Sequence, residues 1–265
     1  MRRALGIDVG GTKIAAGVVD GATGSILARE TIPTRPERGG ASVLADCVAL
    51  AAQLGDGTLP IGVGLCELVG LAGRAESAAT IDWQGLDVAA GFEAPAVVLE
   101  SDVRAAARAE ARFGAGAGRS PFLYVTVGTG TSACLMIDGM PYCGARGHAI
   151  TLGAPPVELV ASGAALARRA GLESAEAVLA DPAHAALVDE AASALGQVLA
   201  VLCNMLDPEL VVIGGGLGSE PSFRGRVEAA TRPLIEYPPT RALDILGATL
   251  GVDAGLVGAA LAALD

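Results

Sequence analysis

The chain has 265 residues, of which 52% are hydrophobic and 18% are charged, so it can bury a core in one large or two modest domains. Its formal net charge of −11 and the absence of a Lys/Arg cluster oppose binding to DNA or RNA. Five widely spaced cysteines without a CxxC pair indicate neither a disulfide scaffold nor a cysteine zinc site. No run approaches the roughly 20 apolar residues of a membrane helix, so we expect a soluble, cytoplasmic protein.

Residues 4–21 predict a strand, a tight turn, a second strand and a second turn. Glycines without Cβ let backbone N–H groups approach an anion, and a neighbouring hydroxyl and ammonium add to the attraction. The first turn, which is therefore suited to phosphate, consists of Gly10, Gly11, Thr12 and Lys13. Asp8 would sit in an apolar sheet unless a magnesium–phosphate group drew it to the strand end. The alternative is an ordinary glycine hairpin with a solvated aspartate.

A third strand at 25–31, a helix at 42–54 and a short buried strand at 61–65 follow. Glu67 comes directly after the buried strand, and it is either a solvated loop charge or a carboxylate in a cleft. Asp82 lies in a polar loop beside the only tryptophan, Trp83, whose first interpretation is packing and whose second is lining a cleft.

A strand at 96–100 leads into an alanine-rich helix at 101–112, which Ser101 could cap. Asp102 therefore lies where the strand meets the helix. An acidic residue there is commonly a partner of the helix dipole, which should lower its pKa. It could also be a base that positions a substrate hydroxyl, as phosphoryl transfer requires.

Residues 122–139 repeat the pattern of the first hairpin, with an apolar run, a Gly/Thr turn, a second apolar run and an Asp-Gly turn. The repeated turn consists of Gly128, Thr129 and Gly130. A third glycine turn follows the strand at 209–213 and consists of Gly214, Gly215 and Gly216. Three glycine turns after buried strands predict two homologous α/β halves with a ligand cleft between them.

The glycine-rich stretch at 114–118 is the expected hinge between these halves. Further elements are expected as helices at 164–170, 173–180, 184–206 and 221–236, a strand at 245–250 and an apolar helix from Asp253 to the end. The two histidines, His148 and His184, are far apart, which argues against a histidine metal site or a hydrolase triad.

Six motifs in this order resemble the ROK family of sugar kinases and related regulators, and together they cover almost the whole chain. They are Asp8-Val-Gly-Gly-Thr-Lys13, Ser101-Asp102 before an Ala-rich helix, Gly128-Thr-Gly130, Glu158 before Ala-Ser-Gly163, Gly214-Gly-Gly216 and Asp253-Ala-Gly-Leu. The resemblance implies an α/β fold of two ribonuclease-H-like domains of the actin/hexokinase-like type. We expect these domains at 1–113, completed by a C-terminal helix at about 253–265, and at 114–252.

The resemblance also implies roles for the motif residues. Asp102 matches the catalytic aspartate that accepts the sugar hydroxyl proton, and Asp8 is expected near Mg²⁺. Residues 10–13 and 128–130 are expected to hold the phosphates of ATP, with Gly214 to Gly216 bordering the adenosine. The residues expected to contact the substrate are Ser101, Asp102, Glu158, Glu67, Asp82 and His148.

Several positions depart from the family pattern. The family's zinc-binding histidine and cysteine cluster is replaced by 152–158, so no zinc site is expected. The Glu-x-Gly-His sugar contact aligns with Thr151-Leu152-Gly153-Ala154, the usual Asn before the catalytic Asp is Ser101, and the usual Pro-Gly after the glycine-rich strand is Cys66-Glu67. Because each lost hydrogen bond costs on the order of 1–3 kcal/mol, glucose itself should bind poorly.

The sequence thus favours an ATP- and Mg²⁺-dependent kinase acting on a polyhydroxylated small molecule, such as a sugar derivative or a cyclitol. One alternative is a non-catalytic sugar or nucleotide sensor, which would not need Asp102 as a base. Another is an actin-like structural ATPase, which the Glu158 segment and the chain length disfavour. No membrane or nucleic-acid partner is expected, and the family resemblance suggests a homodimer.

Overall fold

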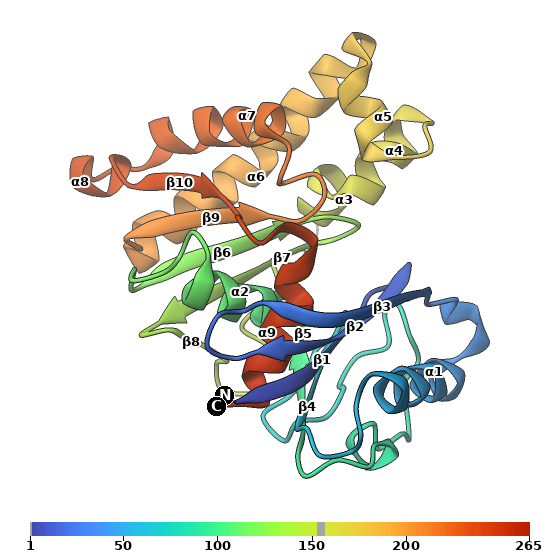
Figure 1. The fold of residues 1–265 in the computed structure, drawn as a ribbon. Coiled ribbons are helices and arrows are strands. Elements are labelled where there is room, and N and C mark those ends of the chain that lie inside the picture. Colours follow the sequence, from blue (N-terminus) through green and yellow to red (C-terminus); the bar gives the residue numbers. More distant parts are fainter. Residues whose placement is uncertain (1, 153–156) are drawn as a thin grey trace. The chain divides into compact units, whose positions relative to one another are not determined.

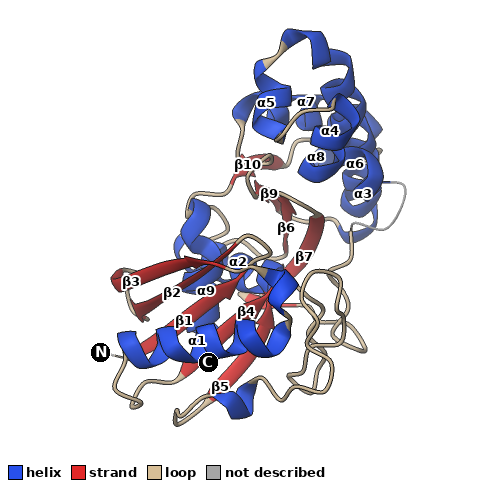
Figure 2. Ribbon diagram, turned by 90° about the vertical axis from the view of Figure 1, so that its right-hand side faces the viewer, coloured by secondary structure: helices blue, strands red, loops and turns tan. Residues whose placement is uncertain are grey.

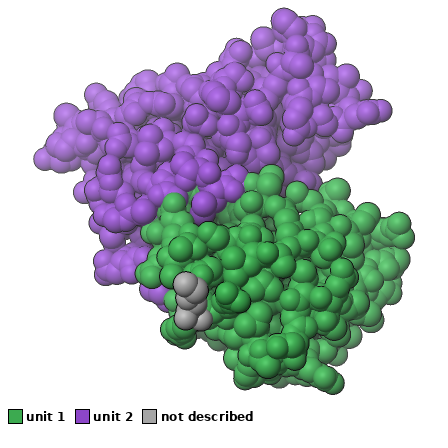
Figure 3. Space-filling model, viewed as in Figure 1, with its two compact units in different colours: residues 1–113, 143–149, 252–265 green, residues 114–142, 150–251 purple. Residues whose placement is uncertain are grey.

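The computed structural model describes residues 2–152 and 157–265, which form a mixed α/β structure (Figure 1). Two compact units divide the chain (Figure 3). Unit 1 contains the residues up to Phe113, Cys143–Ala149 and Val252–Asp265, and unit 2 contains Gly114–Tyr142 and Ile150–Gly251. The domain bounds expected from the sequence stay a prediction, and they did not assign Cys143–Ala149 to the first unit.

The sheet of unit 1 has the strand order β3-β2-β1-β4-β5, with β1 antiparallel to β2 and parallel to β4. Its strands are β1 (Arg3–Val9), β2 (Lys13–Asp20), β3 (Ile26–Pro33), β4 (Ile61–Leu65) and β5 (Val97–Ser101). The register places Asp8 beside Gly64 and Gly64 beside Glu100. The ends of β1, β4 and β5 therefore lie along one edge of the sheet, and Asp102 follows at that edge.

Helices cover both faces of this sheet (Figure 2). These are α1 (Gly40–Leu54) on one face, and α2 (Asp102–Phe113) with α9 (Ala254–Ala262) on the other. The buried side of α1 packs with apolar residues of β1, β2 and β4 in one core cluster. On the opposite face, Gly6 and Gly62 leave room for α9, because a Cβ at either would collide with the carbonyl oxygen of Leu256 or Ala259.

The sheet of unit 2 has the order β10-β9-β6-β7-β8. Its strands are β6 (Phe122–Val127), β7 (Thr131–Ile137), β8 (Met140–Pro141), β9 (Leu210–Gly214) and β10 (Asp244–Gly247). As in unit 1, three consecutive antiparallel strands are followed by two parallel ones. The matching topology agrees with the two homologous halves that the repeated turn pattern predicts.

The helices of unit 2 are α3 (Val157–Ala161), α4 (Gly163–Ala170), α5 (Ala175–Ala180), α6 (Ala185–Leu206), α7 (Pro221–Thr231) and α8 (Pro238–Arg241). The sequence predicted neither α3 nor α8. It also placed the end of α7 at 236, but the helix ends at Thr231 and a 3₁₀ turn containing Pro233 follows. Proline lacks the backbone N–H that a continuing α-helix would need, so this difference has a local cause.

One segment, Pro182–Leu206, is long and apolar enough to cross a membrane by length and composition, with a mean hydropathy of 1.5 over its most apolar 18 residues. The segment contains Asp189 and Glu190, so it is not an uninterrupted apolar run of the kind that the sequence analysis did not find. Its apolar side chains include Leu195, Leu199 and Cys203, which are fully buried in the core of unit 2. Core packing therefore accounts for the hydropathy of this helix.

Candidate functional site

The first glycine turn connects β1 and β2 in unit 1. Its backbone is fastened by bonds from Gly10 N to Lys13 O (3.0 Å) and from Thr34 N to Thr12 O (3.0 Å). The hydroxyl of Thr34, a buried residue, donates to Gly10 O (2.6 Å). Thr12 and Lys13 are exposed. The turn is thus a rigid loop that leaves a hydroxyl and an ammonium accessible, as phosphate binding would require.

Asp8 lies two residues before this turn, near the end of β1. Its carboxylate is half-buried and packs against Gly255, at the first turn of α9. Burial raises the pKa of Asp8 to about 6, although the positive charges of Lys13 and Arg29 oppose the rise. No hydrogen bond to this carboxylate is found among the described residues, so its oxygens are available to a cation or its water shell.

Asp102 is the first residue of α2, directly after β5. Its Oδ1 accepts a hydrogen bond from the N–H of Val103 (2.7 Å). Burial and then repulsion from Asp8 raise the pKa of Asp102 to about 7, with a smaller contribution from Glu67. The sequence expectation that the helix dipole would lower this pKa is wrong, because desolvation and a neighbouring carboxylate outweigh the helix terminus. A carboxylate with this pKa is a suitable proton acceptor near neutral pH.

Ser101 is fully buried. Its hydroxyl donates to Glu67 O (2.9 Å) and accepts from Val69 N (3.1 Å). It therefore joins the end of β5 to the segment after β4, and these bonds stand in place of the expected cap of α2. The expected substrate contact of Ser101 stays a prediction.

Glu67 has an internal role as well. It is 4% exposed, and its carboxylate accepts hydrogen bonds from the Ser77 hydroxyl and from three backbone N–H groups, those of Ala79 (2.9 Å), Thr80 (2.6 Å) and Ile81 (2.9 Å). Four donors occupy the lone pairs that a carboxylate presents. Glu67 thus organises the loop at 77–81, and its expected contact with the substrate stays a prediction.

This loop continues into Asp82 and Trp83. Asp82 is exposed, and its Oδ1 accepts from Gln84 N (3.0 Å) in a local turn. Trp83 is 3% exposed and packs in the core of unit 1, as its first interpretation predicted. Thr80 lies on the same loop, close to Gly11, so the loop fastened by Glu67 borders the phosphate-type turn.

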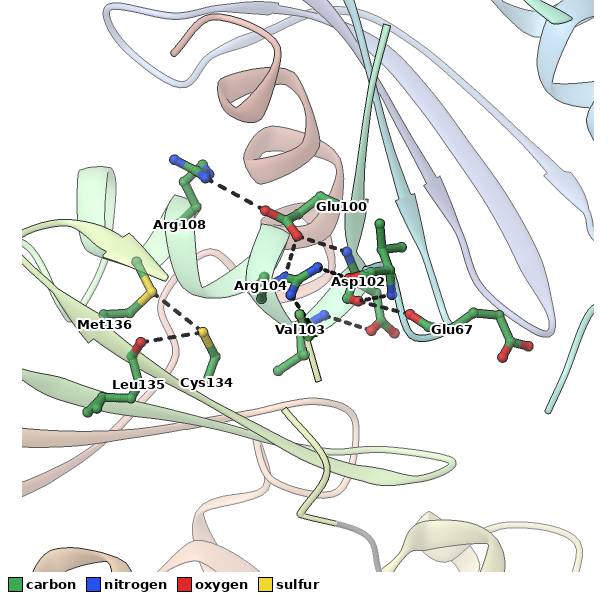
Figure 4. Close-up of polar contacts among 12 residues, drawn as sticks. Glu67, Glu100, Asp102, Val103, Arg104, Arg108, Cys134, Leu135 and Met136 are labelled. Carbon is green, nitrogen blue, oxygen red and sulfur yellow. Dashed lines mark hydrogen bonds and ion pairs between the residues drawn. The ribbon is translucent and has the colours of Figure 1, made fainter. Parts of the chain in front are cut away.

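Arg104 was missed by the sequence reasoning. This residue is 3% exposed, and its guanidinium forms an ion pair with Glu100 and donates to Val69 O (2.6 Å) and Gly147 O (2.7 Å). Figure 4 shows Arg104 beside Glu100 and Asp102. Glu100 also lies 3.7 Å from Arg108. Glu100 ends a strand and Arg104 lies on the following helix, so neither this ion pair nor the bonds to Val69 and Gly147 had a signal in the sequence.

His148 belongs to the segment that Arg104 holds. Its Nε2 lies 2.6 Å from Oε2 of Glu76, a second residue that the sequence reasoning missed. Residues 151–154 stand where the family has its Glu-x-Gly-His contact. Thr151 is exposed, whereas Gly153 and Ala154 lie outside the described residues. Within 2–152 and 157–265, no group of three or more His, Cys, Asp or Glu residues could hold a metal ion.

The repeated hairpin turn lies in unit 2. Gly128 N bonds to Gly130 O (2.9 Å), and Gly128 O accepts from Gly163 N (2.7 Å), at the start of α4. Oε2 of Glu158 accepts from the N–H and the hydroxyl of Thr131, at 2.9 and 2.6 Å. Glu158 therefore holds the first residue of β7, next to the turn, and its expected contact with the substrate stays a prediction.

The third glycine turn lies next to this hairpin, because β9 pairs with β6 and places Gly214 beside Thr126. Gly215 has a φ of 83°, and a Cβ there would meet Val127 O (2.5 Å) and the Thr126 hydroxyl (2.7 Å). Only glycine fits such a position. Thr129 and Gly130 are exposed, so unit 2 presents two adjacent glycine turns with accessible backbone.

The sequence model of the ROK family matches residues 4–265. The chain is 32% identical to a glucokinase of Streptomyces coelicolor, over 97% of this chain and 96% of that protein. It is 31% identical to an N-acetylmannosamine kinase of Yersinia pseudotuberculosis, over 98% of each. The crystal structure of a ROK family glucokinase from Streptomyces griseus in complex with glucose and AMPPNP has a TM-score of 0.83 at 29% identity, covering 97% of this chain and 98% of that one. The expected fold of the actin/hexokinase-like type is confirmed.

Proposed function

The chain belongs to the ROK family, and on this basis we propose that it is an ATP-dependent kinase that phosphorylates a hydroxyl of a sugar or sugar-like polyol with Asp102 as the base. The observation that carries the proposal is the position and pKa of Asp102. It stands at the edge of the sheet beside Asp8, and its pKa of about 7 keeps a large share of it able to accept a proton at neutral pH.

The two Gly/Thr turns are the proposed phosphate sites. In unit 1 the exposed Thr12 and Lys13 and the backbone of Gly10 and Gly11 would contact phosphate oxygens. In unit 2 Thr129 and Gly130 would do so, and Gly214 to Gly216 would border the nucleoside. Because phosphoryl transfer depends mainly on positioning and charge stabilisation, rigid turns suit this chemistry.

The Mg²⁺ that accompanies ATP fits Asp8. Magnesium in kinases is held by one or two carboxylates together with the phosphates and water, and the half-buried carboxylate of Asp8 has no hydrogen-bond partner among the described residues. Its pKa of about 6 shows that burial costs the charged form free energy, which a bound cation would offset. Bound Mg²⁺ supplies charge neutralisation at the phosphates, and Asp8 would hold it near them.

We propose a sugar derivative or a cyclitol as the acceptor rather than glucose. Ser101 and Glu67 use their polar atoms inside the protein, and Thr151 stands where the family carries a glutamate. The protein therefore has fewer hydrogen-bonding groups with which to bind the sugar hydroxyls near the anomeric carbon. The relatives do not decide between acceptors, because those named glucokinase and N-acetylmannosamine kinase are 32% and 31% identical to this chain.

The test is ADP release from ATP and Mg²⁺ with a panel of hexoses, amino sugars and cyclitols. Asp102→Asn should lower the stimulation given by the true acceptor by roughly 100-fold or more, while Asp87→Asn, at an exposed loop aspartate, should retain it. No stimulation by any compound, with normal ATP binding, would favour the non-catalytic sensor. Efficient phosphorylation of glucose would contradict the proposed acceptor class.

A further inference from the structure

His148 and Glu76 form an accessible imidazole–carboxylate pair in unit 1. Nε2 of His148 lies 2.6 Å from Oε2 of Glu76, and the two side chains are 38% and 40% exposed. The residues come from distant parts of the sequence, so the fold brings them together. Both side chains can thus be reached by a molecule from solution while remaining bonded to each other.

The backbone on either side of the pair is held firmly. Glu76 N donates to Leu68 O (2.7 Å), and the Glu76 carboxylate fills the space that a side chain at Gly70 would occupy. Gly147, with a φ of 86°, packs directly on Gly70. The pair is therefore preorganised, and a ligand would not have to order it.

The same backbone is connected to Asp102. Arg104, in the first turn of the helix that Asp102 begins, donates to the carbonyl oxygens of Val69 and Gly147. Ser101, the residue before Asp102, accepts a bond from Val69 N. The loop that carries Glu76 and the segment that carries His148 are thus fastened to the strand–helix junction at the proposed base.

The hydrogen-bonding character of the pair follows from the tautomer of His148. When the ring is neutral and its Nε2–H donates to the Glu76 carboxylate, Nδ1 is left as a lone-pair acceptor. None of the described residues bonds to Nδ1 of His148. An exposed acceptor held at a fixed place matches a hydroxyl donor, which is the group that a sugar or cyclitol presents in numbers.

We infer that the Glu76–His148 pair is a substrate-recognition element that accepts a hydrogen bond from a hydroxyl of the phosphoryl acceptor. The inference rests on the proposed function and narrows its substrate to compounds with a hydroxyl at this place. Thr151 and Ala154 supply neither the carboxylate nor the imidazole found at those positions in the family. Here both groups come from Glu76 and His148.

The competing explanation is that the Glu76–His148 pair only joins two segments of unit 1 and contacts no ligand. Arg104 and the contact between Gly70 and Gly147 already join the two segments, and exposed ion pairs add little to stability. If the pair were only a structural link, its loss would change the affinity for all ligands alike. If the pair recognises the substrate, its loss would change the affinity only for ligands that carry the hydroxyl.

The experiment is calorimetric binding of polyols and their monodeoxy analogues to the wild-type protein, His148→Phe and Glu76→Gln. For the best polyol, His148→Phe should raise Kd about 10- to 100-fold, and Glu76→Gln should raise it less. One monodeoxy analogue should bind equally to the wild type and to His148→Phe. The Kd for ATP should stay within about twofold in both variants.

The matched control is His184→Phe, because His184 also faces an aspartate, Asp181, at 3.7 Å, but in unit 2. It should bind every compound like the wild type. The inference would be overturned if His148→Phe bound all polyols with the affinity of the wild type. It would also be overturned if His148→Phe lost affinity equally for polyols, all deoxy analogues and ATP. Failure of every polyol to bind the wild type would overturn it as well. A polyol that binds without stimulating ADP release would overturn the kinase function alone, and the same affinities would still decide the role of the pair.

Discussion

The carboxylate of Asp8 occupies the space that a side chain at Gly255 would need, since a Cβ there would lie 2.5 Å from Oδ2 of Asp8. A side chain at 255 must therefore move the aspartate or the first turn of α9. The last helix thus shapes the position of a residue near the beginning of the chain.

Gly255→Ala should lower kcat with ATP and raise the Mg²⁺ concentration needed for half-maximal activity, because the alanine methyl group displaces Asp8. Steady-state kinetics with a Mg²⁺ titration measure both. Gly225→Ala, in α7, is the control, since nothing lies within 4 Å of its added methyl group, and alanine favours a helix by roughly 0.5–1 kcal/mol. Unchanged Mg²⁺ dependence in Gly255→Ala would argue against Asp8 as the metal-side residue.

Asp102→Asn should lower kcat by roughly 100- to 10,000-fold with little change in the KM for ATP, because a positioned base typically contributes that much. In the wild type, kcat/KM should fall as the pH drops below about 7, where Asp102 becomes protonated. The residual activity of the variant should not show this fall of kcat/KM at acidic pH. If the variant showed the same fall, a group other than Asp102 would cause it.

The stability of the ligand-free protein should decrease as the pH rises from about 4 to 7. Folding raises the pKa of Asp8 to about 6 and of Asp102 to about 7, from 3.8, so the folded state binds more protons than the unfolded state in this window. Urea unfolding at several pH values measures how the free energy of unfolding changes with pH. Asp102→Asn should make this pH dependence weaker. An unchanged pH dependence in the variant would show that Asp102 does not cause it.

Glu67→Gln should destabilise unit 1 by about 1–3 kcal/mol, because an amide cannot accept from all four donors of the 77–81 loop. Hydrogen exchange should quicken at the amides of Ala79, Thr80 and Ile81. Glu93→Gln, at an exposed glutamate of the same unit, should leave exchange there unchanged. Slow exchange in Glu67→Gln would mean that other contacts hold the loop.

Thr131→Val should raise the KM for ATP several-fold while leaving the KM for the acceptor unchanged. The substitution keeps the shape of the side chain but removes its 2.6 Å bond to Glu158, which braces the turn at Gly128 to Gly130. Initial rates with each substrate varied separately distinguish the two constants. A rise in the acceptor KM alone would point to a role of Glu158 in acceptor binding.

The repeated features of the chain could be predicted from sequence, because they depend on neighbouring residues. The two hairpins, their glycine turns and the strand-to-helix junction at Asp102 each follow from local alternation and turn residues. A glycine inside a short buried strand, as at Gly62, likewise indicates that another backbone approaches closely, and α9 does so.

The roles of individual polar residues could not be predicted in the same way. Ser101 bonds to residues 32 and 34 positions away, and Arg104 bonds to Gly147, 43 positions away. Such partners depend on how the strands and loops come together. For the same reason the pKa of Asp102 was wrongly expected to be low, since its burial and the approach of Asp8 are properties of the folded unit.

The packing of α9 against Gly6 and Gly62 also constrains the order in which the two units fold during synthesis. During synthesis, β1 and β4 leave the ribosome long before residues 252–265, and until then one face of their sheet lacks its covering helix. All of residues 114–251 emerge in the meantime. We therefore expect the nascent chain to complete unit 2 first, although the N-terminal unit is the first to be translated.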